Sequence, residues 1–164
     1  MNVVVGELPT SLAAMQSMAI ADLSSPERTA ALAIAALAVY PDDAAAAVEM
    51  IDWLKGPDAL SVFEKQFLRD RVMDGVDYVA RSYFAGATPA NNYEPSRPYE
   101  VAVEENQYSY DTEGYARLWL KSGGADNPRE ITLRQKKSTG QWFLVSYQGL
   151  LAGIRVPESQ DPWT

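Results

Sequence analysis

The side chains that this chain offers for chemistry are carboxylates, hydroxyls, amides, lysines and arginines, because its 164 residues include no histidine and no cysteine. Without cysteine there is no disulfide, thiolate nucleophile, iron–sulfur cluster or cysteine-ligated zinc. Without histidine the commonest general base and the commonest transition-metal ligand are missing. Carboxylate pairs, oxygen sites for hard cations and Ser–Lys dyads stay open, whereas a Ser–His–Asp triad is excluded.

The first candidate site is a polar and aromatic stretch over residues 81–99. Its amides, rings and guanidinium groups suit the recognition of a carboxylate, a phosphate or a protein surface. The candidate binding residues are Arg81, Asn91, Asn92, Tyr93, Arg97 and Tyr99. The alternative is that the amides satisfy local backbone groups and the rings pack the loop onto the domain. This alternative is favoured, because a long loop needs such contacts to be ordered.

The second candidate site is a basic face on a predicted strand. We expect an anion-binding patch there, formed by Arg129, Arg134 and Lys136, with Lys137 and Arg117 beside them. A local positive patch on an acidic protein can bind an anion or an acidic partner. The favoured alternative is a solvated face whose cations pair across the strands with Glu100, Glu104 and Glu130.

The acidic residues do not predict a metal site. Asp42–Asp43 and the spaced Asp70, Asp74 and Asp77 lack the alternating pattern of a calcium loop, and helix capping and surface charge explain them. We expect no metal and no cofactor. A carboxylate pair for acid–base chemistry remains possible, because residues distant in sequence can meet in the fold.

The net charge of −8 is concentrated in the first half of the chain. Residues 1–80 carry 5 basic and 12 acidic residues, whereas residues 81–164 carry 9 basic and 10 acidic residues. Such a chain repels phosphate backbones and anionic lipids, so we expect neither nucleic acid nor a membrane as partner. Because no secretory leader or membrane span is recognisable, we expect a cytoplasmic location.

The elements that must position these residues are helices first and strands second. Start and stop signals predict helices over residues 28–40, 43–55 and 61–72, with a shorter one near 11–18. Ser25-Pro26-Glu27 opens the first of these, Asp42 caps the next, and Ser61 with Glu64 forms a capping box. On the last helix, Val62, Phe63, Phe67 and Leu68 are expected inside.

Alternating apolar residues predict four strands near residues 99–104, 115–121, 130–137 and 141–148, with a hairpin turn at Ser138-Thr139-Gly140. We therefore expect an α+β fold in which N-terminal helices pack on one face of an antiparallel meander of about four strands. One domain spans 1–164: a helical part (1–75), a long connecting loop (76–98), the sheet (99–156) and a tail (157–164). Trp163 in the tail is expected to dock onto the body.

Several unusual strings, in order, resemble a known family. They are YPDDAAAAVEMIDWLKGPDALSVFEKQFLRDRV, SYFAGATPANNYEPSRPY, SGGADNPREITLRQKKSTGQWFL and SQDPWT. The chain is similar to an uncharacterised bacterial family, a domain of unknown function from gut-dwelling Gram-positive bacteria. The resemblance implies one domain over most of the chain, and it implies no activity, cofactor or catalytic residue.

Three functional hypotheses follow. The favoured one is a non-enzymatic binding or interaction domain that uses the 81–99 loop and the open sheet face to bind a protein or small molecule. The second is a hydrolase or isomerase that uses carboxylates and tyrosine in a cleft between helices and sheet, which requires at least one Asp or Glu buried in a pocket with a raised pKa. The third is a homo-oligomer joined through Tyr115, Trp119 and Tyr147 on the sheet face.

Overall fold

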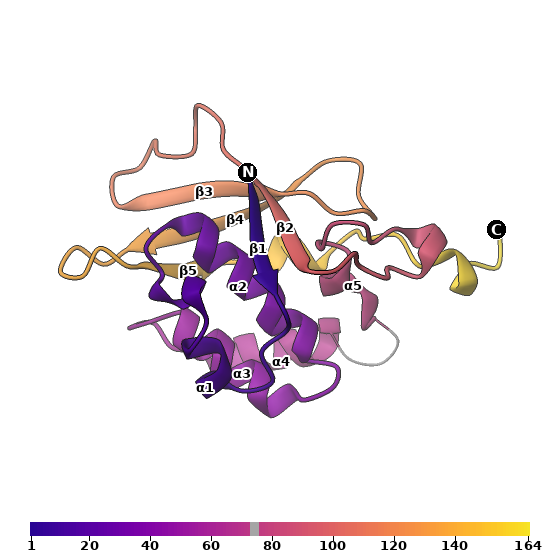
Figure 1. Cartoon of the computed structure of the whole chain (residues 1–164), viewed down its shortest axis with the longest axis horizontal. Coiled ribbons are helices and arrows are strands. Elements are labelled where there is room, and N and C mark those ends of the chain that lie inside the picture. Colours follow the sequence, from indigo (N-terminus) through magenta and orange to yellow (C-terminus); the bar gives the residue numbers. More distant parts are fainter. Residues whose placement is uncertain (73–75) are drawn as a thin grey trace.

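The computed structural model describes residues 1–72 and 76–164, which form an α+β fold (Figure 1). These residues contain one antiparallel sheet in the order β1-β2-β3-β4-β5, so each strand pairs with the next in the chain. The strands are β1 (Asn2–Gly6), β2 (Tyr99–Glu104), β3 (Tyr115–Leu120), β4 (Arg129–Gln135) and β5 (Trp142–Ser146). The α+β class and the meander are confirmed, but the expected number of strands is one too few.

The additional strand is β1, which lies beside β2 although the helices separate the two in sequence (Figure 1). Val3 pairs with Val101, and the register shifts between Val4 and Gly6. Val3 and Val5 are buried and the residues between and before them are exposed, which is the alternation of a strand with one face on the core. Only three valines carry this pattern, which is too short a run to distinguish a strand from a loop.

Helix α2 (Pro26–Val39) is the centre of the core. Ser25 caps it by accepting from the amide of Arg28, Pro26 occupies its first turn, and Glu27 follows, as predicted. Every residue of α2 except Arg28 is buried. The helix contacts β1, β2, β4 and β5 on one side and α3 (Ala44–Leu54) on another, so it is covered nearly all round.

The other predicted helices are present with small differences at their ends. Ser11 caps α1 (Leu12–Gln16), and α3 is capped by Asp43, whose side chain accepts from the amide of Ala46. Asp42 was expected in that role. Helix α4 (Val62–Val72) begins with the predicted capping box, in which the amide of Glu64 donates to Ser61 Oγ (3.0 Å) and the amide of Ser61 donates to Glu64 Oε1 (3.4 Å).

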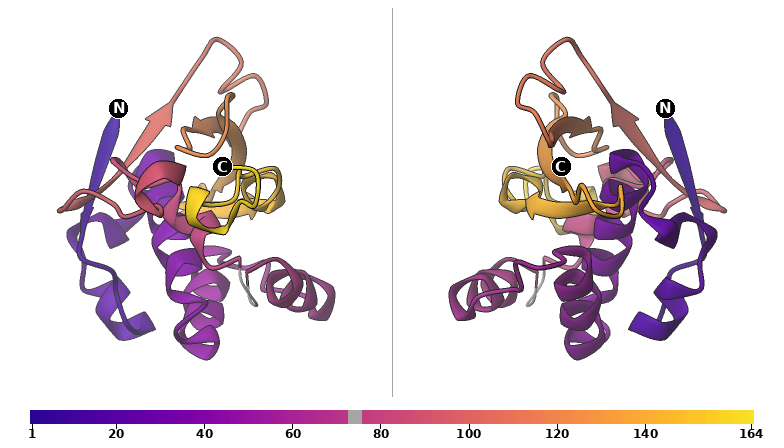
Figure 2. Two further views of the ribbon diagram at one scale, coloured as in Figure 1. Left: turned by 90° about the vertical axis from the view of Figure 1, so that its right-hand side faces the viewer. Right: turned by 90° about the vertical axis from the view of Figure 1, so that its left-hand side faces the viewer.

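Helix α4 is less embedded than expected. Val62 and Phe63 are 85% and 80% exposed, so their predicted burial is wrong. In α4 only Leu68 and Val72 are buried. Figure 2 shows α4 standing to one side of α2 and α3.

The connection predicted over residues 76–98 has structure of its own. It contains α5 (Tyr78–Arg81), a 3₁₀ turn at Pro89–Asn91, and an isolated bridge between Phe84 and Val101 of β2. Beyond the sheet, the chain returns past this connection (Figure 1). Trp163 near its end is 91% exposed, so the expected docking of this side chain is wrong.

Two searches of the described ranges, 1–72 and 76–164, gave negative results. None of the helices there combines the length and the hydropathy that crossing a bilayer requires. No three carboxylates in these ranges lie close enough together to hold a metal ion. Of the acidic residues weighed above, Asp74 lies outside the described residues.

Candidate functional site

A cavity of about 510 Å³ lies between the end of α3, the start of β3 and the β4–β5 hairpin. Its volume is in the range of small-molecule sites. Its lining residues come from four short segments: Lys55, Pro57 and Asp58; Glu113, Gly114 and Tyr115; Arg134, Gln135, Lys136 and Lys137; and Phe143, Leu144 and Val145. Segments distant in sequence therefore share one wall.

The close approach of α3 to β5 places Lys55 in this wall. Lys55 is the C-cap of α3, and Gly56 follows with a φ of +62°, a backbone conformation that residues other than glycine rarely adopt. A Cβ atom on Gly56 would lie 2.7 Å from Cδ1 of Phe143. Only a glycine allows the end of α3 to lie this close to the Phe143 ring. The contact with the ring in turn fixes the position of the neighbouring Lys55 backbone.

A row of side chains across three strands forms another part of the wall. Tyr115 of β3 pairs with Arg134 of β4, and Arg134 pairs with Phe143 of β5. The guanidinium carbon of Arg134 lies 5.3 Å from the centre of the Tyr115 ring. The aromatic face orients the guanidinium without neutralising it, so Arg134 keeps its hydrogen-bonding capacity for a ligand.

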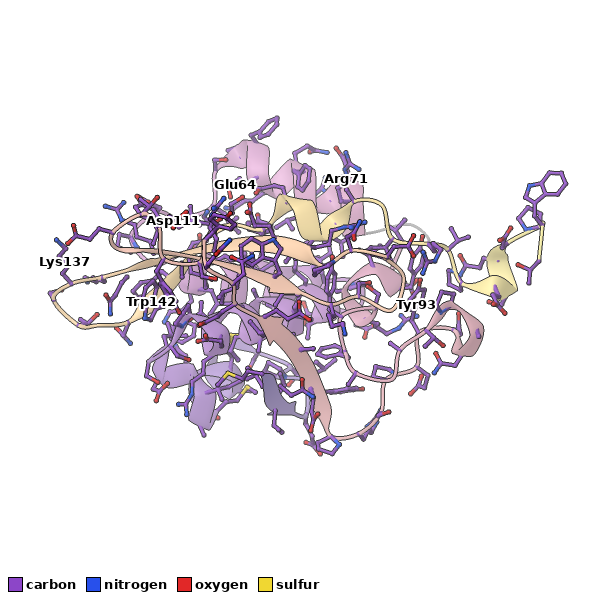
Figure 3. The ribbon with its side chains drawn as sticks, turned by 90° about the horizontal axis from the view of Figure 1, so that it is seen from above. Glu64, Arg71, Tyr93, Asp111, Lys137 and Trp142 are labelled. Carbon is purple, nitrogen blue, oxygen red and sulfur yellow. The ribbon has the colours of Figure 1, made fainter. Side chains whose placement is uncertain are left out.

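The charge of the cavity is opposite to that of the protein. Four cationic side chains line it, Lys55, Arg134, Lys136 and Lys137, against two carboxylates, Asp58 and Glu113. The whole chain carries −8. Cations held together in this way favour an anionic occupant, since self-repulsion among them is relieved when an anion binds. Figure 3 shows Lys137 at the far end of the hairpin and Glu64 nearer the middle of the molecule.

The inner part of the site is a cluster of Lys55, Glu64 and Tyr147. Lys55 is 7% exposed, and its Nζ lies 3.2 Å from Glu64 Oε2 and donates to the carbonyl of Val145 (3.4 Å). The hydroxyl of Tyr147 donates to the same carboxylate (3.5 Å). Burial and the neighbouring Glu64 charge raise the pKa of Tyr147, so its phenol remains a donor. Because Tyr147 is buried, it cannot form the intermolecular contact expected of it in the oligomer hypothesis.

The predicted basic patch is divided by the structure. Arg134 and Lys136 line the cavity. Arg129 does not, because its guanidinium donates to the carbonyls of Asn127, Ala152 and Gly153 and holds the segment after β5. Arg117 lies 3.5 Å from Glu130 in a cross-strand pair, which was the alternative considered for this face.

None of the six residues predicted in the 81–99 loop lines the cavity, and Figure 3 shows Tyr93 far from Lys137, which does. Asn91 forms a capping box with Thr88 and donates to the carbonyls of Gly86 (2.8 Å) and Glu94 (3.2 Å). Tyr93 is buried, stacks on Tyr78, and donates to the carbonyl of Arg155 (2.5 Å). These two side chains order the loop and attach the C-terminal segment to it.

The remaining loop residues have mixed surroundings. Arg81 donates to the carbonyls of Asn92 and Tyr93, which fixes the turn between them. Tyr99 stacks on Phe84, and the guanidinium carbon of Arg97 lies 5.2 Å from the centre of the Tyr99 ring. Asn92 and Arg97 are exposed. Ligand binding by this loop remains a prediction, and Asn92 and Arg97 are the residues available for it.

One carboxylate, Glu27, meets part of what the enzyme hypothesis requires, because it is buried with a raised pKa but does not line the cavity. Glu27 is 8% exposed, and burial, followed by a hydrogen bond with Glu105, raises its pKa. The pKa of Glu105 is lowered by its hydrogen bonds with Glu27 and with Tyr110, whose hydroxyl donates at 2.7 Å. The pKa of Glu27 is therefore raised and that of Glu105 lowered, but Glu27 does not line the cavity.

Sequence reasoning missed Lys55, which the structure places at the centre of the site. The one available signal was a lysine directly before the Gly-Pro that ends a helix, where it is normally read as a favourable charge for the helix dipole. Its contact with Glu64 depends on where the start of α4 lies relative to the end of α3, which no local sequence pattern predicts.

The comparisons with known proteins identify a family and no function. A family model described as "Domain of unknown function (DUF6935)" matches residues 7–158, which is most of the chain. Searches of curated proteins and of solved structures gave no match. The match agrees with the resemblance noted from the unusual strings, and it adds no catalytic or binding residue to those that the structure shows.

Proposed function

We propose that this chain, which belongs to the DUF6935 family, is a non-enzymatic binding domain that holds a small oxyanion in the cavity beside Lys55. The observation that supports this proposal is the convergence of four cations on one cavity in a chain whose net charge is −8. If these cations were only a solvated strand face, Lys55 would not be among them, because it lies at the end of α3 and is buried.

The chemistry of the wall indicates the class of ligand. A guanidinium with a free edge binds carboxylate or phosphate through two parallel hydrogen bonds, and the lysines add charge that is less directional. The rings of Tyr115 and Phe143 offer apolar contact for the body of an organic anion. The occupant is therefore a small molecule with a phosphate or carboxylate group attached to an apolar part.

Calorimetric titration at low salt tests the proposal, with inorganic phosphate, pyrophosphate and citrate as probes. Arg134→Gln should weaken the binding of the best probe by about tenfold, since a charge-assisted hydrogen bond contributes about 1.5–3 kcal/mol. Arg117→Gln is the matched control, because it removes the same charge from an exposed strand position outside this cavity. No binding of any probe, or equal weakening by both variants, would reject the proposal.

A second candidate function is carboxylate chemistry at Glu27, and its burial beside Glu105 favours it. Such an enzyme would hydrolyse or isomerise its substrate with one carboxyl protonated and the other ionised. Turnover of chromogenic ester or glycoside substrates that is lost in Glu27→Gln would support it over the binding proposal. In either case we retain the cytoplasmic location as part of the proposal.

A further inference from the structure

The contact that holds α4 also reaches the cavity. Lys55 lines the cavity and at the same time forms the ion pair with Glu64 of α4. Val145, whose carbonyl accepts from Lys55, lines the cavity as well. Glu64 does not line the cavity, so Lys55 contacts the cavity and a carboxylate outside it at the same time.

Helix α4 has few other attachments near Glu64. Leu60, just before the helix, is fixed by its amide, which donates to Asp52 Oδ1 (2.8 Å). Val62 and Phe63 are in solvent, and the next buried residue is Leu68. Between Leu60 and Leu68, the ion pair with Lys55 and the hydrogen bond from Tyr147 are therefore the polar contacts that hold the helix to the body.

An anion that approaches Lys55 competes with Glu64. The Lys55 side chain is only 7% exposed, so its ammonium group has little room for two anions, and two negative charges a few ångströms apart repel each other strongly where water is scarce. A ligand that binds Lys55 therefore weakens the ion pair between Lys55 and Glu64. By linkage, the docked helix must weaken ligand binding by the same factor by which the bound ligand weakens the docking of the helix.

We propose that anion binding in the cavity releases the first turns of α4, because the ligand replaces Glu64 as the partner of Lys55. The proposal rests on the proposed function, since it needs the cavity to bind an anion. It makes the site a switch: the occupied form presents α4 with Glu64, Val62 and Phe63 free, and the empty form holds the helix through Glu64.

Hydrogen–deuterium exchange of the full chain tests this directly, with pyrophosphate as the probe and the amides of α2 as the internal reference. In the natural sequence, saturating pyrophosphate should speed exchange over residues 62–67 by about fivefold, the low end of ordinary coupling between sites. Glu64→Gln should show fast exchange there without the probe, no further change with it, and tighter pyrophosphate binding.

Glu113→Gln is the matched control, because Glu113 lines the cavity and has no contact with Lys55 among the hydrogen bonds and ion pairs found. It also removes a repelling charge and should tighten binding, but the exchange of α4 should still respond to the probe. If pyrophosphate binds the natural sequence and exchange over 62–67 stays the same or slows, the switch is rejected and the binding function stands. If pyrophosphate, phosphate and citrate all fail to bind, both proposals fall together.

Discussion

Nζ of Lys55 lies 3.2 Å from Oε2 of Glu64, and this ion pair joins the end of α3 to the first turn of α4. The lysine is nearly covered, whereas the carboxylate is 20% exposed. A pair with one buried member is costly to break, because the remaining charge loses its partner without regaining full hydration.

Lys55→Met should therefore destabilise the domain by about 2 kcal/mol, since it keeps the apolar stem and removes the partner of Glu64. Urea unfolding followed by circular dichroism measures the change. Lys65→Met, on the exposed side of α4, is the control and should be within about 0.5 kcal/mol of the natural protein. Equal effects of the two substitutions would show that the Lys55–Glu64 pair adds nothing to stability.

Gly56→Ala should destabilise the domain by about 1–3 kcal/mol and weaken anion binding, because the new methyl group meets the Phe143 ring and shifts Lys55. Gly140→Ala separates this clash from backbone strain. Gly140 also has a positive φ, +75°, but no atom lies within 4 Å of the place where its Cβ would be. Thermal unfolding should rank Gly56→Ala as the more harmful, and the reverse order would contradict the close approach of α3 to β5.

Glu27→Gln should change how stability depends on pH. The folded-state pKa of Glu27 lies above the ordinary 4.5, so its proton stabilises the fold fully below that value, and this contribution is lost as pH rises through the raised pKa. The variant amide can donate to Glu105 at every pH. The unfolding midpoint in urea should therefore shift in favour of the variant as pH rises from about 4 to about 7.

The exposed Glu49→Gln is the control for the pH series, and its difference from the natural protein should not grow in the same direction. A Glu27→Gln difference that stays flat with pH would mean that the pKa of Glu27 is not raised in the fold.

Phe63→Ser should leave the free energy of unfolding within about 0.5 kcal/mol of its natural value, because the ring is 80% exposed. Leu68→Ala, one turn further along α4 and fully buried, should cost about 2–5 kcal/mol. Chemical unfolding of the two variants tests the orientation of α4. A large loss with Phe63→Ser would restore the burial expected from sequence.

The sequence predicted those elements whose boundaries depend on nearby residues. Ser25 and Pro26 set the start of α2, and Ser61 with Glu64 sets the start of α4, because capping is a contact within one helical turn. The strands β2, β3 and β4 were found because alternation over six or seven residues is a strong signal.

Features that depend on tertiary arrangement were missed or wrong. Phe63 looked like a core residue, since aromatic residues in helices usually are, but its side chain in the first turn of α4 is 80% exposed. The site was half found: Arg134 and Lys136 were in the predicted patch, whereas Lys55 joins them only because α3 ends against Phe143. Arg129 has the same charge as Arg134 and lies on the same strand. The sequence alone could not show that Arg129 donates to backbone carbonyls whereas Arg134 lines the cavity.

The pairing of Val3 with Val101 has a consequence for synthesis. The ribosome releases β1 before any of the helices, and β1 has no neighbour in the sheet until β2 emerges. At a typical elongation rate this wait lasts roughly 5–20 s, far longer than helices take to form and dock. The helical part therefore has time to form around α2 before β2 emerges, and during that interval β1 is an unpaired strand edge that a chaperone can recognise.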